Sequence, residues 1–135
     1  MPYELKLATQ TRGLAAIVKV AGTLDIYGAP DLDREIDRLL RGRSREILVD
    51  LRGIDFMDSI GIRSLVRAYR VAMKAGVPLW IVRGGTAVSQ VLRMTGVDVT
   101  LPMIDELPRR LQQRVPLAVA RRDVQRDIRI SSGNR

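Results

Sequence analysis

The apolar positions of this chain alternate between the two-residue period of β-strands and the roughly 3.6-residue period of α-helices. Near the N-terminus, two strand-like segments flank the turn signal Thr11-Arg12-Gly13 and predict a β-hairpin. Strand-like and helix-like segments then follow one another. The predicted strands are 3–9, 15–21, 46–51, 79–82 and 99–103, and the predicted helices are 31–41, 58–75, 88–96 and 105–114. This order predicts an α/β fold in which a mixed sheet of four or five strands packs against helices.

The stretch 56–62 places a hydroxyl group at a predicted helix start. It reads Phe-Met-Asp-Ser-Ile-Gly-Ile and follows strand 46–51, which the turn residues Arg52 and Gly53 are expected to close. Apolar residues recur at helical spacing after it, so Asp58 and Ser59 lie where a helix begins. The first N–H groups of a helix lack partners within the helix and carry partial positive charge. This point can therefore hold an anionic group, including a phosphate on Ser59.

Two interpretations of Asp58 and Ser59 are compatible with each other. In the first, either residue caps the helix, since Asp and Ser are favoured there and a cap stabilises by about 1 kcal/mol. In the second, Ser59 is an exposed switch. Phe56 and Met57 are expected in the core, although a partly exposed Met57 would offer a partner an adaptable apolar contact.

The composition restricts the chemistry that the chain can perform. There is no Cys and no His, which removes thiolate nucleophiles, the commonest general base and the commonest transition-metal ligand. An oxygen-only Mg²⁺ or Ca²⁺ site stays open from composition alone. Asp25 and Asp58 would make paired catalytic acids only if they shared a cleft. Since a Gly-rich phosphate loop is also missing, we expect no enzymatic activity, no catalytic residues, no cofactor and no metal site.

The net charge of +8 is unevenly distributed. Residues 109–135 hold eight Arg and two Asp and so carry +6, while residues 1–108 are nearly balanced. We expect one domain over residues 1–115 and a flexible basic C-terminal tail over residues 116–135. The tail is solvated, approaches anionic surfaces or contacts a partner. It has no aromatic residue for base stacking, so direct binding of nucleic acid is not expected.

The chain shows no sign of entering a membrane. No segment approaches the roughly 18 consecutive apolar residues of a membrane span, and the N-terminal residues lack the layout of a signal peptide. We therefore expect no membrane insertion and a cytoplasmic location. The oligomeric state stays open, because the predicted edge strand 99–103 can either pair or remain free.

Four sequence blocks follow one another along the chain. They are Gly22-x-Leu24-Asp25, then Ile47-Leu48-Val49-Asp50-Leu51, then Phe56-Met57-Asp58-Ser59-x-Gly61, and finally Ala87-Val88 followed by Leu92 and Met94-Thr95-Gly96-Val97. Their order and spacing, over about residues 14–107, resemble the STAS domain of bacterial anti-sigma-factor antagonists. The Asp-Ser-x-Gly block is the most specific part of this resemblance. It implies a single STAS-like domain.

The resemblance implies a protein that regulates transcription by partner switching, as in a bacterial stress response. The unphosphorylated antagonist binds an anti-sigma factor that is also a serine protein kinase, and phosphorylation releases it until a phosphatase resets it. Ser59 would be the phosphoacceptor of this phosphoprotein. The partner-binding residues carried over or placed around it are Asp25, Met57, Asp58, Ile60, Gly61 and Arg63.

Two residues depart from the family pattern, and two alternatives stay open. Ile60 replaces a common Ser or Thr, so no second hydroxyl can substitute for Ser59, and Thr23 stands where an acidic residue is common. In the first alternative, the chain is a soluble STAS subunit that docks a membrane transport system without phosphorylation. In the second, it is a scaffold component of a stress-signalling assembly, although such components usually carry an additional sensory domain.

Overall fold

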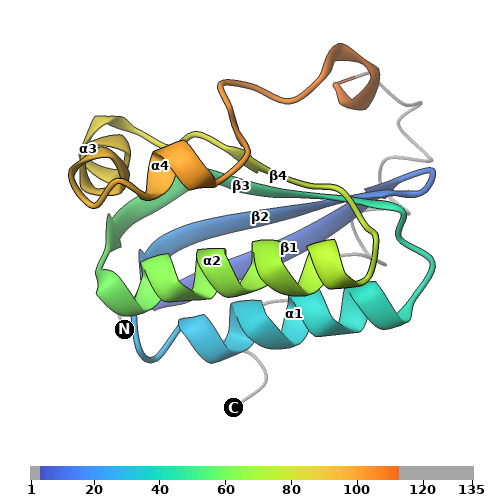
Figure 1. Ribbon diagram of the computed structural model, residues 1–135, viewed down its shortest axis with the longest axis horizontal. Coiled ribbons are helices and arrows are strands. Elements are labelled where there is room, and N and C mark those ends of the chain that lie inside the picture. The colour runs from blue at the N-terminus through green and yellow to red at the C-terminus, as the bar shows by residue number, and fades with distance from the viewer. Residues whose placement is uncertain (1–3, 113–135) are drawn as a thin grey trace.

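The computed structural model describes residues 4–112, and these residues form one mixed five-stranded sheet with helices packed on it (Figure 1). The strands are β1 (Leu5–Arg12), β2 (Ala15–Leu24), β3 (Glu46–Met57), β4 (Leu79–Val82) and β5 (Met103–Ile104), and they lie in this order across the sheet. The first two strands form an antiparallel hairpin, and the other pairings are parallel. The predicted α/β class, hairpin and mixed sheet are confirmed.

Two long helices cover one face of the sheet. The helices are α1 (Ala29–Arg41), α2 (Ser59–Lys74), α3 (Thr86–Met94) and α4 (Val97–Thr100), followed by a 3-10 turn at Arg109–Leu111. Figure 1 shows α1 and α2 side by side along the sheet. Alternate strand residues such as Val18, Val49 and Ile81 pack with Ile36 of α1 and Leu65 of α2 in the main core, and all five are fully buried.

The opposite face of the sheet is covered in part by the segment after β5. Leu107 and Leu111 pack there against Ile17, Leu48 and Val82 in a second, smaller core. These residues alternate with those of the main core along each strand, as the two-residue period requires. Burial on both faces explains why residues 47–49 of β3 form a continuous apolar run.

The expected turn at Arg52 and Gly53 is wrong, because β3 continues through them to Met57. The pairing with β2 passes this point by shifting register between Lys19 and Ala21, and again between Gly22 and Thr23. Gly53 fits because a Cβ there would lie 2.9 Å from the Cβ of Ala21. The glycine therefore permits a close approach of two strands instead of ending one.

Two predictions near the C-terminal end of the described chain are also wrong. Residues 99–103 do not form a strand: α4 occupies Val97–Thr100, and only Met103–Ile104 pairs with β4. Gly96, at a φ of 74°, supplies the left-handed residue between α3 and α4. Over residues 105–112, the described part of the expected helix 105–114, the chain is extended at Pro108 and then makes one 3-10 turn.

Some expectations fall outside the described residues. The domain end at residue 115 and the tail 116–135 lie beyond residue 112. Among residues 4–112, no helix is both long and apolar enough to cross a membrane, and no cluster of acidic side chains in that range is arranged to hold a metal ion.

Gly61→Ala is predicted to lower the free energy of unfolding by at least about 1 kcal/mol. Its methyl group would lie 2.3 Å from the carbonyl oxygen of Leu24 and 2.7 Å from Cγ of Met57. This overlap should outweigh the roughly 1 kcal/mol that alanine gains over glycine inside a helix.

Urea unfolding of the Gly61→Ala and Gly85→Ala variants tests this prediction. Gly85 precedes α3 and has nothing within 4 Å of an added Cβ, so its variant should lose only about 0.5 kcal/mol of capping preference. An unchanged or raised midpoint for Gly61→Ala would show that the start of α2 is loosely packed.

Candidate functional site

The carboxyl ends of β2 and β3 meet at one edge of the sheet. Leu24, the last residue of β2, is paired with Met57, the last residue of β3. Each strand is followed at once by an aspartate, Asp25 or Asp58. The Asp58 amide N–H also donates to the carbonyl oxygen of Leu24 at 3.4 Å. The loops that lead into α1 and α2 therefore begin side by side.

Asp58 caps the N-terminus of α2. Its backbone is extended, and its Oδ1 accepts hydrogen bonds from the amide N–H groups of Ile60 at 3.0 Å and Gly61 at 3.1 Å. Two of the unpaired amide groups at this helix end are satisfied in this way. The capping function therefore belongs to Asp58, and Ser59 is the first residue within the helix.

Asp25 makes similar hydrogen bonds to backbone N–H groups in the neighbouring loop, ahead of α1, whose N-cap is Gly28. Its Oδ1 accepts from the N–H groups of Tyr27 at 3.0 Å and Gly28 at 3.1 Å, and its carbonyl oxygen accepts from Ala29 at 2.8 Å. This arrangement closes the turn into α1. Both aspartates are thus bound to backbone N–H groups, which accounts for them without a role as paired catalytic acids.

Ser59 and Arg63 are exposed on the first two turns of α2, and Ile60 between them is half-buried. Ser59 and Arg63 are four residues apart, so they lie on the same side of the helix. Ile60 and Arg63 also line a shallow groove of about 660 Å³, which runs between the start of α1, α2 and Val97. The predicted serine therefore faces solvent beside a half-apolar groove.

Met57 and Gly61 do not reach the surface. The Met57 side chain is only 3% exposed, so the expectation that it lies in the core is confirmed and the alternative of partial exposure is not found. Gly61 is buried against Leu24 and Met57. Both residues pack beneath the loop. They would affect the binding of a partner only by fixing the positions of Asp58 and Ser59.

Three apolar side chains near this edge are exposed, and the sequence analysis either did not single them out or predicted them to be buried. Ile26 is 60% exposed and Tyr27 is 82% exposed, in the capping turn after Asp25. Phe56, expected in the core, is 56% exposed. The exposure of Ile26 and Tyr27 could have been predicted from the sequence, because they follow Asp25 in a turn that has neither the strand nor the helix period of a buried face.

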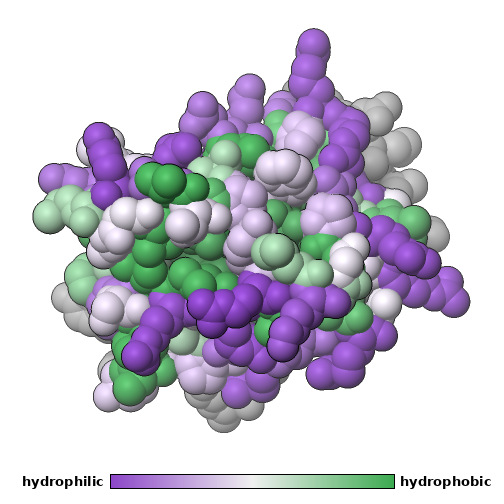
Figure 2. All heavy atoms as spheres, viewed as in Figure 1, coloured by the Kyte–Doolittle hydropathy of each residue, from purple (hydrophilic) through white to green (hydrophobic). Residues whose placement is uncertain are grey.

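Figure 2 shows where hydrophobic side chains reach the surface on the face that carries α1 and α2. They gather at the left of the view, over the start of α2 and over α3 and α4. Met94 at the end of α3 and Val99 in α4 are 78% and 85% exposed. Hydrophilic side chains dominate along the exposed side of α2 toward its C-terminus. The end of the molecule that presents Ser59 is therefore also its more apolar end on this face.

Comparison with known proteins agrees with this geometry. The family model described as "Mlab, STAS domain" matches residues 7–107. The chain belongs to the STAS domain family. The expected resemblance is thereby confirmed, and it extends slightly further toward the N-terminus than the sequence blocks indicated.

Relatives of this STAS domain carry the name anti-sigma-B factor antagonist. An anti-sigma-B factor antagonist of Staphylococcus aureus is 27% identical over 94 residues, covering 70% of this chain and 87% of the relative.

Two solved proteins share the STAS fold of this chain. An anti-sigma factor antagonist from Mycobacterium paratuberculosis aligns with a TM-score of 0.73 at 24% identity, over 83% of this chain and 95% of that one. SpoIIAA, an anti-sigma factor antagonist, aligns in its unphosphorylated form with a TM-score of 0.66 at 16% identity, over 82% of this chain and 99% of that one. The phosphorylated form of SpoIIAA, from Bacillus, aligns with a TM-score of 0.62.

Asp58→Ala is predicted to lower the free energy of unfolding of the STAS domain by about 1 kcal/mol, because two amide N–H groups lose their acceptor. Asp58→Asn keeps an acceptor oxygen and should cost less than half as much. Asp55→Ala, an exposed aspartate three residues earlier, serves as the matched control and should stay near the parent. Equal stability of Asp58→Ala and Asp55→Ala in urea unfolding would contradict the capping assignment.

Proposed function

We propose that this chain is a bacterial anti-sigma-factor antagonist that binds an anti-sigma factor acting also as a serine protein kinase, and that phosphorylation of Ser59 switches this binding off. A phosphatase restores the binding form. In this proposal the chain is a cytoplasmic, non-enzymatic regulator of transcription that uses no cofactor. The observation that carries the proposal is the division of labour at the start of α2, where Asp58 caps the helix and Ser59 is left exposed.

The surface around Ser59 supports a protein partner. Exposed Ile26 and Tyr27 and half-buried Ile60 offer apolar contacts, and aromatic side chains such as that of Tyr27 are enriched at protein interfaces. Arg63 adds an exposed positive charge one turn from the serine. Apolar anchors beside a single modifiable hydroxyl are suited to an interface that a local charge change can disrupt.

A phosphate at Ser59 would change charge more than shape. It adds nearly two negative charges at neutral pH. The N-terminus of α2 and Arg63 favour such a group, whereas the carboxylates of Asp58 and Asp25 disfavour it. Because Asp58 rather than Ser59 holds the cap, modification leaves the helix start intact. The similarity of this fold to both the unphosphorylated and the phosphorylated form of SpoIIAA supports an effect on binding without refolding.

Ser59 is the only exposed hydroxyl in the first turns of α2. Ile60 follows it, and the next serine, Ser64, is 4% exposed and donates its hydroxyl to Asp33 Oδ1 at 2.7 Å. Among residues 58–64, therefore, the proposal allows a single phosphoacceptor. Arg67 on the same helix is held by Asp37 at 3.0 Å, so Arg63 is the nearer cation left to meet a partner or a phosphate.

Ser59→Glu is predicted to weaken binding to the partner anti-sigma factor by at least about tenfold, because a negative charge enters an interface formed around a neutral hydroxyl. Ser59→Ala should bind like the parent. Isothermal titration calorimetry with the purified anti-sigma factor measures both. Thr86→Glu is the matched control, since Thr86 is also the exposed first residue of a helix, α3. Parent-like binding by Ser59→Glu would refute the switch.

Incubation with the partner kinase and ATP is predicted to add one phosphate, about 80 Da, at Ser59. Mass spectrometry of the intact protein and of its peptides gives the count and the site, and Ser59→Ala should gain no mass. A phosphate mapped to Thr86 or Thr95 instead would contradict the assignment. A chain that is never modified and co-purifies with membrane transport proteins would favour the transport alternative.

A further inference from the structure

The end of the molecule opposite Ser59 carries a second concave surface. At this end α1 and α2 finish, β2, β3 and β4 begin, and the hairpin turn between β1 and β2 lies beside the loop that follows α1. The Arg45 amide N–H donates to the carbonyl oxygen of Leu14 at 2.8 Å and ties that loop to the hairpin. α2 has 16 residues, so its two ends are separated by about 24 Å at 1.5 Å per residue.

Two hollows meet at this end. One has a volume of about 460 Å³ and the other about 520 Å³, and both are lined by Leu14, Gly42, Arg43 and Ser44. We call the joined surface the basic groove. It extends from Thr9 and Arg38 on one side to Arg45 and Val77 on the other.

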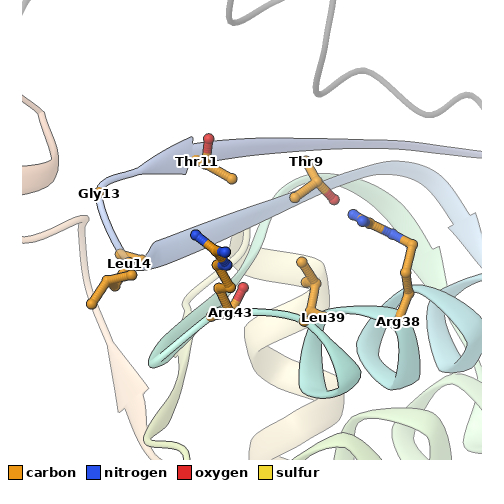
Figure 3. A pocket seen from close by; sticks show the side chains of 10 residues that line it. Thr9, Thr11, Gly13, Leu14, Arg38, Leu39 and Arg43 are labelled. Atoms are coloured by element: carbon orange, nitrogen blue, oxygen red, sulfur yellow. The ribbon is translucent and has the colours of Figure 1, made fainter.

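The walls of the basic groove carry positive charge that the described chain does not neutralise. Figure 3 shows Arg38 and Leu39 near the end of α1, and Arg43 on the segment after it, directed toward the hairpin strand that carries Thr9 and Thr11. Arg38 is ion-paired with Glu35 at 2.7 Å. Arg43 and Arg45 are exposed, lie beyond the helix end and form no ion pair with any residue between 4 and 112.

The same groove has apolar surface. Leu14, at the tip of the hairpin, is 58% exposed, a position where polar residues are usual. Leu40 and Val77 are half-buried and line the second hollow beside it. A ligand of this surface would therefore gain from placing an apolar side chain next to Leu14 while its anionic groups approach Arg43 and Arg45.

We propose that the basic groove binds an acidic peptide segment of a partner protein, in which a leucine-like side chain stands among Asp or Glu residues. The groove is lined by no aromatic residue, which disfavours stacked single-stranded nucleic acid. The chain's own residues 109–135 carry +6, the same sign as the groove, which disfavours them as its occupant.

The position of the groove makes it independent of the phosphorylation site. A charge at Ser59, about 24 Å away along α2, is screened over a Debye length of about 8–10 Å in physiological salt. The chain could thus hold an acidic segment and an anti-sigma factor at the same time. This inference goes beyond the proposed function and does not depend on it.

Titration of the ¹⁵N-labelled full-length, unphosphorylated chain with a synthetic twelve-residue peptide of Glu, Asp and Leu tests the proposal. Amide shifts are expected at residues 13–14, 42–45 and 75–77. Binding should weaken when the NaCl concentration is raised from about 50 mM to about 300 mM, because salt screens the charges of the groove. The double variant Arg43→Glu/Arg45→Glu should bind about tenfold or more weakly. Arg70→Glu/Arg93→Glu, with the same charge change at exposed sites elsewhere, should bind like the parent.

Two further measurements distinguish binding in the basic groove from nonspecific electrostatic attraction. A peptide with Ser in place of Leu should bind several-fold more weakly, and Leu14→Ser should weaken the leucine peptide to a similar extent. Shifts confined to residues 109–135, equal binding of the serine peptide, or tighter binding of a ten-nucleotide oligo-dT at residues 42–45 would each overturn the proposal. None of these measurements involves the anti-sigma factor, so their failure leaves the role of Ser59 untouched.

Discussion

The parallel pairing of β2 with β3 is the constraint on which the site depends. It places Leu24 opposite Met57, so the two strands end together and the two aspartates that follow begin adjacent loops. Each aspartate then satisfies the first amide groups of its own turn or helix. A shift of one residue in this register would exchange the buried and exposed faces of β3 and separate the two loops.

Local packing gives that edge its shape. Gly61 lets the first turn of α2 approach the end of β2 more closely than a Cβ would allow, and Met57 fills the space beneath it. Asp58 caps α2, so the Ser59 hydroxyl is not needed to cap the start of this helix. Because Gly61 and Met57 are buried beneath the loop and Ser59 is exposed on it, the charge at Ser59 can change without a change of fold.

The sequence alone was sufficient for the hairpin, for the alternation of strands and helices and for the start of α2, because each rests on a strong periodic or capping signal. It was not sufficient for β3, where Gly53 resembles a turn residue but serves a close strand contact. It also placed a strand at residues 99–103, where a four-residue helix after Gly96 has too few turns to show a period. At the site, Asp58 and Ser59 are both good caps, and only geometry distinguishes them. Phe56 was expected inside because its type favours burial, but it lies on the exposed side of β3.

Hydrogen-exchange mass spectrometry of the chain, free and bound to its anti-sigma factor, tests the account most directly. We predict that binding slows exchange at the amides of residues 25–28 and 58–64, where the two capped turns present Tyr27 and Ser59, and that phosphorylation of Ser59 removes this protection while the free protein keeps its exchange pattern elsewhere. Protection confined to the face of the sheet opposite α1 and α2, or protection unchanged by the phosphate, would contradict the account.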